Sequence, residues 1–135
     1  MTSTERNKAI VRRFYDRVLN RKQLDAIDAL CAPTYHGDAP GADRAAFKQF
    51  YGRFLAAFPD LRVSFEDVLA EGNRVVVRAT ARGTHRGEFL GVPATGAQVS
   101  WTGISITRLV DGQIVQQTGE QDFLGVLRQL RGGSI

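Results

Sequence analysis

The chain has 135 residues, 43% of them hydrophobic and 24% charged, which is ordinary for one water-soluble domain spanning residues 1–135. No apolar run approaches the roughly 18 residues of a membrane span, and residues 1–8 lack the apolar segment of a secretory signal, so no membrane partner is expected. The arginines behind the net charge of +4 are spread over the whole chain, which argues against a nucleic-acid partner.

Helical spacing of apolar residues dominates the first part of the chain. Thr2 and Glu5 have the spacing of a capping box, and the helix that they begin runs to about residue 20. A short second helix ends at Pro33. A third helix over about residues 43–58 carries an aromatic stripe, which is usually core but also suits one wall of a cavity. The stripe consists of Phe47, Phe50, Tyr51, Phe54, Leu55 and Phe58.

From Leu61 onward the apolar residues alternate, which predicts strands joined mainly as hairpins. The expected strands cover residues 61–69, 74–85, 99–110 and 113–121, followed by a helix over 123–130 and a loose tail over 131–135. The inner face of the second strand shrinks to Ala and Gly toward its end, which leaves space for another element or a ligand. That face consists of Val75, Val77, Ala79, Ala81, Gly83 and His85.

Three helices before a set of hairpin-linked strands predict an α+β fold, with the helices on one face of an antiparallel sheet. A strongly curved sheet wrapped over these helices makes a cone with a central apolar pocket. Such a pocket suits a hydrophobic small-molecule substrate.

Asp122 is the first candidate for chemistry, because it stands where the last strand meets the last helix. If its side chain enters the pocket, burial raises its pKa and makes it a general acid/base. The alternative is equally specific, since Asp is a favoured N-cap and a helix begins at Phe123. Glu120 shares a strand face with Asp122 and is a second inward carboxylate or an exposed strand residue.

His85 is placed at the pocket rim, where it hydrogen-bonds a substrate oxygen or is a loop residue with no catalytic role. His36 lies in the loop after the second helix, and together with Asp38 and His85 it matches no standard ligand spacing, so no metal is expected. No nucleophile elbow or nucleotide-binding motif is present. The single cysteine, Cys31, excludes an internal disulfide and fits a cytoplasmic protein.

Several stretches carry a family resemblance, namely residues 7–15, 57–63, 84–96 and 111–122, with 124–125 after the last of them. On these residues the chain resembles the SnoaL-like polyketide cyclases, or ester cyclases, of the nuclear-transport-factor-2-like superfamily. The resemblance implies a cone-shaped monomer that forms a homodimer or higher homo-oligomer through its sheet. It also implies an intramolecular aldol condensation without metal or organic cofactor, with an Asp at the position of Asp122 as acid/base. The chain departs from many relatives at Gln116, Gln117 and Thr118.

The leading hypothesis is therefore a cofactor-free cyclase for a hydrophobic carbonyl or ester substrate. Asp122 and His85 are its expected catalytic residues. The expected substrate-binding residues are Tyr15, His36, Phe50, Phe54, Phe58, Trp101, Thr118 and Glu120. The alternatives are an enzyme of the same family that opens epoxides, isomerises or hydroxylates, and a non-catalytic dimeric binding module.

Overall fold

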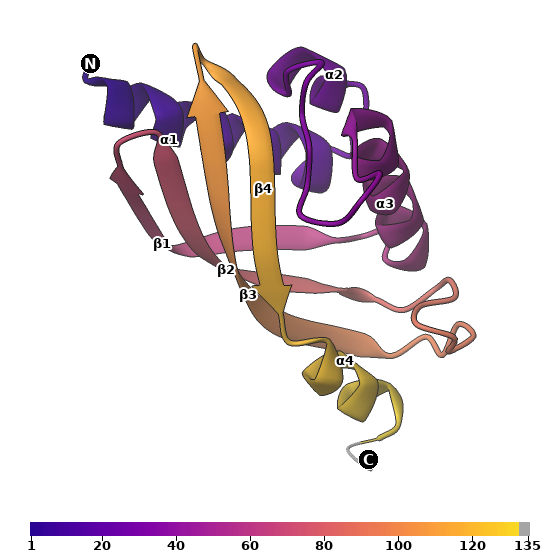
Figure 1. The fold of residues 1–135 in the computed structure, drawn as a ribbon. Coiled ribbons are helices and arrows are strands. Elements are labelled where there is room, and N and C mark those ends of the chain that lie inside the picture. The colour runs from indigo at the N-terminus through magenta and orange to yellow at the C-terminus, as the bar shows by residue number, and fades with distance from the viewer. Residues whose placement is uncertain (133–135) are drawn as a thin grey trace.

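The computed structural model describes residues 1–132, so part of the predicted tail, residues 133–135, lies outside the described residues. Helices and strands follow the order expected from the sequence, as Figure 1 shows. The elements are α1 (Ser3–Phe14), η1 (Tyr15–Asn20), α2 (Ala26–Leu30), α3 (Arg44–Ala57), β1 (Arg62–Glu71), β2 (Arg74–Thr84), β3 (Gln98–Val110), β4 (Gln113–Gln121) and α4 (Phe123–Leu130).

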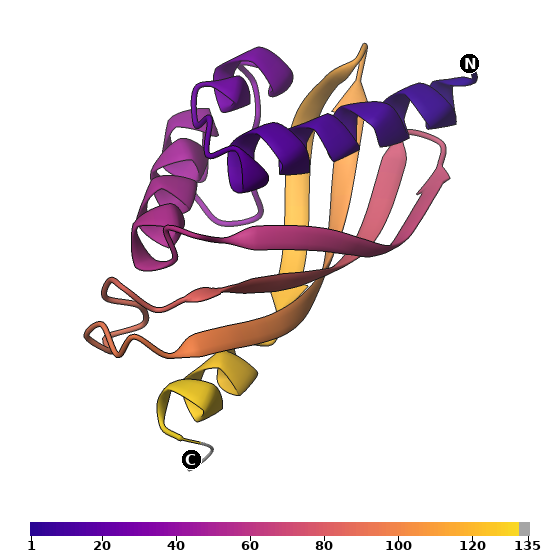
Figure 2. The same cartoon turned by 180° about the vertical axis from the view of Figure 1, so that it is seen from behind.

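The strands form one antiparallel sheet in the order β1-β2-β3-β4, and its strong curvature is visible from both sides (Figure 1, Figure 2). The helices α1 to α3 lie on the side toward which the sheet curves, with α1 crossing the strands, while α4 follows β4 at the opposite end (Figure 2). This arrangement confirms the predicted α+β fold.

The first helix begins with the predicted capping box. The Glu5 backbone N–H donates to the Thr2 hydroxyl, and the Glu5 carboxylate accepts from the Thr2 N–H, each over 3.2 Å. After Phe14 the helix widens into the π-helix η1. The extra residue per turn lets adjacent pairs of side chains share the buried face, so that Tyr15 as well as Phe14 points into the interior.

The inner face of β2 agrees with the predicted alternation. Val75 and Val77 are fully buried near the start of the strand, and the smaller Ala79 and Ala81 follow beneath the helices. Arg74, on the other face, is exposed. Because the inner side chains shrink along the strand, the space between sheet and helices widens toward the C-terminal end of β2.

β1 does not keep the alternation expected from its sequence. Phe65 pairs with Ala79 and Asp67 pairs with Arg78, so Glu66 is the extra residue of a β-bulge. A strand that gains one residue reverses the faces of all the residues beyond it. Leu69, expected on the same face as Phe65, is consequently 65% exposed.

β4 contains a second bulge, at Val115, opposite Arg108 and Leu109 of β3. Ile114, just before the bulge, faces the core and is 1% exposed. Uninterrupted alternation from Ile114 would turn the even-numbered residues inward. The extra residue reverses this order, and the inward side of β4 is formed by Gln117, Gly119 and Gln121.

Aromatic rings fill the space between α3 and the sheet. Phe54 of α3 lies 5.7 Å, between ring centroids, from both Phe89 and Trp101. Phe58 lies 5.1 Å from the same two rings, and it is completely buried. Such edge-to-face and tilted contacts add roughly 0.5–1.5 kcal/mol each to the stabilisation from burial. These members of the aromatic stripe of α3 therefore pack in the hydrophobic core at one end of the domain.

Candidate active site

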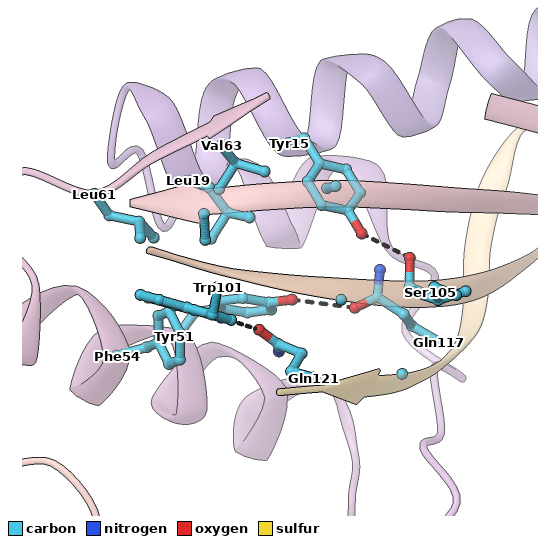
Figure 3. Close-up of a pocket in the computed structure, with 15 residues that line it drawn as sticks. Tyr15, Leu19, Tyr51, Phe54, Leu61, Val63, Trp101, Ser105, Gln117 and Gln121 are labelled. Carbon is cyan, nitrogen blue, oxygen red and sulfur yellow. Dashed lines mark hydrogen bonds between the residues drawn. The ribbon is translucent and has the colours of Figure 1, made fainter. Parts of the chain in front are cut away.

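A cavity of about 70 Å³ lies between the inner face of the sheet and the helices (Figure 3). Solvent reaches Gly119 and Gln121, so the cavity opens along β4, the edge strand of the sheet. The lining residues come from η1, α3, all the strands and the turn before β1. They are Tyr15, Leu19, Tyr51, Phe54, Leu61, Val63, Ala79, Ala81, Trp101, Gly103, Ile104, Ser105, Gln117, Gly119 and Gln121.

Small residues on the sheet create this cavity. The side of the cavity formed by the sheet is lined by Ala79 and Ala81 of β2, Gly103 of β3 and Gly119 of β4. At Gly119 a Cβ atom would meet nothing closer than the Ile104 carbonyl oxygen at 3.6 Å, so this position has room for a Cβ atom in ordinary van der Waals contact. The shrinking inner face of the second strand was the signal in the sequence that located the hollow part of the domain.

Three hydrogen-bonded pairs bring polar groups into the apolar wall (Figure 3). The Tyr15 and Ser105 hydroxyl oxygens lie 2.7 Å apart, and the Tyr51 hydroxyl donates to the Gln117 side-chain oxygen over 3.1 Å. The Trp101 indole N–H donates to the side-chain oxygen of Gln121 over 2.9 Å. These contacts fix the direction of each polar group before any ligand arrives.

The cavity is electrically neutral along its described lining, where Asp, Glu, Lys, Arg and His are all absent. Burial raises the pKa of the Tyr15 phenol, and the hydrogen bond with Ser105 opposes this only in part. Burial likewise raises the pKa of Tyr51 well above its usual value. A phenol with a raised pKa stays protonated at neutral pH. Both tyrosines are therefore hydrogen-bond donors rather than bases.

Asp122 does not line the cavity, so of the two alternatives that the sequence left open the structure has the N-cap, and a catalytic role for Asp122 stays a prediction. Its side chain is exposed and accepts from the Gly125 N–H over 2.8 Å as the N-cap of α4. The Val115 bulge is the physical reason, because it turns the even-numbered residues of β4 away from the interior. Asp122 therefore has the position of a helix N-cap, as one of the two interpretations of the sequence proposed.

The same bulge places Glu120 and Thr118 on the outer face. Glu120 is exposed and borders a shallow outer groove with Arg78 and Asp122. Thr118 is paired with Ile106 of β3, whose side chain is 43% exposed on that outer face. Neither side chain lines this cavity, and a role of either residue in substrate binding stays a prediction.

The two histidines also lie away from the cavity lining. His85 is completely buried, and its Nδ1 accepts from the Thr95 backbone N–H over 3.2 Å and lies 2.9 Å from the Thr95 hydroxyl. It organises the base of the loop between β2 and β3 rather than the pocket rim. His36 is exposed, with its Nδ1 2.6 Å from the Gly37 carbonyl oxygen.

The predicted aromatic wall is divided. Phe54 and Trp101 line the cavity together with Tyr15, and their contacts with substrate stay a prediction. Phe58 stands behind Trp101 as buried packing and does not line the cavity. Phe50, 39% exposed, borders a separate shallow groove with Phe54 and the loop after β2. An amphipathic pattern identifies the buried face of a helix but does not separate a cavity wall from the packing behind it.

Several cavity residues were not singled out from the sequence. Tyr51 was seen only as part of the aromatic stripe, although its hydroxyl faces the cavity. Ser105 shares strand parity with Trp101 and Gly103, which is the one signal that could have found it. Gln117 and Gln121 were hidden by the bulge, since nothing in the sequence marks Val115 as an extra residue.

Two other properties concern residues 1–132 as a whole. In this part of the chain no three His, Cys, Asp or Glu side chains gather as a metal site requires. Over the same residues, no helix has both the length and the apolar character needed to cross a bilayer.

Comparison with known proteins gives consistent similarities. A family model described as SnoaL-like polyketide cyclase matches residues 9–130. The nogalonic acid methyl ester cyclase of Streptomyces nogalater is 32% identical over 120 residues, which are 82% of this chain and 87% of that protein.

A second curated relative is matched over a shorter stretch. Aklanonic acid methyl ester cyclase DnrD of Streptomyces peucetius is 38% identical over 85 residues, which are 57% of this chain and only 59% of that enzyme's length. Among solved structures, TsrD from Streptomyces laurentii superposes with a TM-score of 0.88 at 26% identity, covering 99% of this chain and 100% of that one.

Proposed function

Because the chain belongs to the SnoaL-like polyketide cyclase family, we propose that this enzyme closes a ring in a polyketide-like ester or ketone within the cavity. The observation that supports the cavity as the site is its lining, in which aromatic rings alternate with fixed, neutral hydrogen-bonding groups. Such a lining suits a flat, carbonyl-rich molecule without net charge.

The proposed reaction is an intramolecular aldol closure. A carbon between two carbonyl groups loses a proton, and its electron pair forms the new C–C bond to a second carbonyl carbon of the same molecule. The π electrons of that carbonyl move to its oxygen, which takes up a proton and becomes a hydroxyl. One C–H bond is lost and one O–H bond gained, so the product has the mass of the substrate and no oxidant or reductant is consumed.

The cavity contributes by stabilising negative charge on oxygen. The Tyr15 hydroxyl, which can accept from the Ser105 hydroxyl, is placed to donate its own proton to the enolate or alkoxide oxygen, whereas the Tyr51 proton is bound by the Gln117 side-chain oxygen. Delocalisation over two carbonyl groups lowers the pKa of that C–H, so that hydroxide from solvent at the open side of the cavity accepts the carbon's proton and becomes water. Tyr15 can then donate to the alkoxide and regain its proton from that water.

The volume of the cavity limits how the substrate sits. About 70 Å³ is less than half of the roughly 150 Å³ of an engineered apolar cavity that binds a benzene ring. A polycyclic substrate therefore places its reacting carbonyl groups in the cavity and its remaining rings along the open side, past Gly119 and Gln121.

The direct test is an assay with nogalonic acid methyl ester and aklanonic acid methyl ester, the compounds for which the two relatives are named. Mass spectrometry and chromatography of the products decide the reaction type. A new product of unchanged mass supports ring closure by aldol addition without loss of water. A product heavier by one oxygen would replace this proposal with hydroxylation, and recovery of unchanged substrates and of related ketones would contradict it.

The pH dependence follows from the raised pKa values of the two cavity tyrosines. Because a raised pKa keeps each phenol protonated to a higher pH, their donor function is retained below about pH 10. With a substrate that does not titrate, the dissociation constant is expected to stay constant from about pH 5 to pH 9. A fall in affinity or rate at the acidic end, with a midpoint near the usual pKa of a carboxyl group, would indicate a carboxylate in the site.

Asp122→Asn is expected to retain wild-type turnover and stability, because asparagine also caps helices well. Asp122→Ala should keep turnover too, but lose about 1 kcal/mol of unfolding free energy, measured by urea denaturation. An Asn variant that is stable but inactive would restore the catalytic role predicted from the sequence.

We also propose that the enzyme is a homodimer paired through the outer face of its sheet. Ile104 and Ile106 of β3 are 50% and 43% exposed, and Ile104, although part of it lines the cavity, also borders the outer groove beside Glu120. Exposed apolar side chains on the centre of a sheet are typical of interaction surfaces.

A further inference from the structure

The side chain of Gln121 has a fixed orientation at the open side of the cavity. Its oxygen accepts from the Trp101 indole N–H over 2.9 Å, and an indole nitrogen can only donate. The amide therefore cannot be turned over without losing this bond. Because the oxygen of the amide group is bound to Trp101, the nitrogen is the terminal atom that points away from the indole, and both of its N–H donors remain available.

Gly103 makes this orientation possible. It is the direct cross-strand partner of Gln121, and a Cβ atom there would lie 2.8 Å from the Gln121 Cγ. Real Cβ atoms do not approach so closely, so any larger residue would push the Gln121 side chain off its path toward Trp101. Trp101, 3% exposed, is itself held in place by the rings of Phe54 and Phe58.

The Gln121 amide nitrogen has no hydrogen-bond partner among the described residues, and Gln121 lines the cavity that solvent reaches. The other cavity amide is different, since Gln117 donates from its nitrogen to the Thr107 hydroxyl over 3.3 Å and accepts from Tyr51. Gln121 is thus the cavity amide whose two N–H donors both lack a partner among the described residues, whereas Gln117 has one of its two engaged.

We propose that Gln121 is a specificity-determining residue whose amide N–H groups bind an acceptor oxygen of the substrate, a ketone or ester carbonyl rather than a hydroxyl that must donate. This inference rests on the proposed function, since it takes the cavity as the substrate site. A ligand that brings a carbonyl group to this position gains a hydrogen bond. A ligand of the same shape that covers Gln121 without offering an oxygen removes the water that otherwise accepts from the amide and leaves its N–H groups unpaired.

Trp101 supplies the readout, because it is the only tryptophan in the chain and gives a single indole N–H signal in a ¹⁵N NMR spectrum. Two probes are titrated, 1-acetylnaphthalene and 1-ethylnaphthalene, which differ mainly in one carbonyl oxygen. The measured quantity is the ratio of their dissociation constants, so differences in general hydrophobicity cancel between variants.

Gln121→Leu is expected to reduce the preference for the ketone about tenfold relative to the wild-type protein. Gln121→Glu should do the same while keeping the indole signal near its wild-type position, since a carboxylate still accepts from Trp101 but offers no N–H. Gly103→Ala should also weaken the preference, by displacing Gln121. The control is Gln113→Glu, which makes the same change at an exposed position of β4 outside the cavity lining and should leave the ratio unchanged.

The outcomes separate this inference from the proposed function. If both probes shift the indole signal but Gln121→Leu leaves their ratio unchanged, Gln121 does not determine specificity, while the cavity remains the binding site. If neither probe shifts the indole signal at saturating concentration, the cavity is not the site and both proposals fail.

Discussion

Gly119→Val is expected to lower kcat/KM by at least about a hundredfold without destabilising the protein. The backbone accepts the change, because a Cβ there would meet the Ile104 oxygen at 3.6 Å and the Ser105 Cβ at 3.8 Å, which are ordinary contacts. Valine is also favoured over glycine in a strand by up to about 1 kcal/mol. The added side chain would occupy much of a cavity of about 70 Å³ and exclude the substrate from Tyr15.

Thr118→Val is the matched control for this variant. It introduces the same side chain one residue earlier on β4, where the strand faces outward and pairs with Ile106. Turnover of nogalonic acid methyl ester and the melting temperature are measured for both variants. Full activity in Gly119→Val, or a comparable loss in Thr118→Val, would show that the reaction does not take place on the inner face of β4.

Tyr15→Phe is expected to reduce kcat by about a hundredfold or more with little change in KM, since removing one donor to a developing oxyanion typically costs that much. The ring remains in place to fill the wall, so the apolar contacts with substrate persist. The loss of the contact with Ser105 should cost only about 1 kcal/mol of stability. Steady-state kinetics together with urea denaturation separate the two effects.

Tyr35→Phe provides the comparison, because Tyr35 is a buried tyrosine that does not line the cavity. Its ring stacks on Phe47 with centroids 4.5 Å apart, so the variant removes a buried hydroxyl outside the site while keeping the ring. Equal losses of kcat in the two variants would assign the effect to structure rather than to donation by Tyr15, and an unchanged kcat in Tyr15→Phe would remove Tyr15 from the mechanism.

The sequence predicted the order of helices and strands because local signals agree with the fold along most of the chain. The capping box at Thr2 and the glycine turns at Gly72 and Gly112, both with positive φ, mark element ends by local chemistry. The prediction of which residues form the inner face of β2 was also correct, since a strand without a bulge preserves its alternation from Val75 to Ala81.

The side chains of the cavity could not be predicted in the same way. A bulge adds one residue without a sequence signal of its own, and the bulges at Glu66 and Val115 reverse the faces of everything that follows them. This single effect moved Glu120 and Asp122 outside and brought Gln117 and Gln121 inside. Contacts between distant segments, such as that of His85 with Thr95 across a loop, are likewise set by tertiary structure.

The position of a bound product tests the central idea most directly, namely that a neutral, hydroxyl-lined interior holds the reacting atoms. In a crystal structure with the ring-closed product of nogalonic acid methyl ester, we expect a product oxygen about 2.6–3.2 Å from the Tyr15 hydroxyl, with the rings leaving past Gly119. A product seated instead in the outer groove beside Arg78, Glu120 and Asp122 would contradict this account and return the chemistry to the carboxylates.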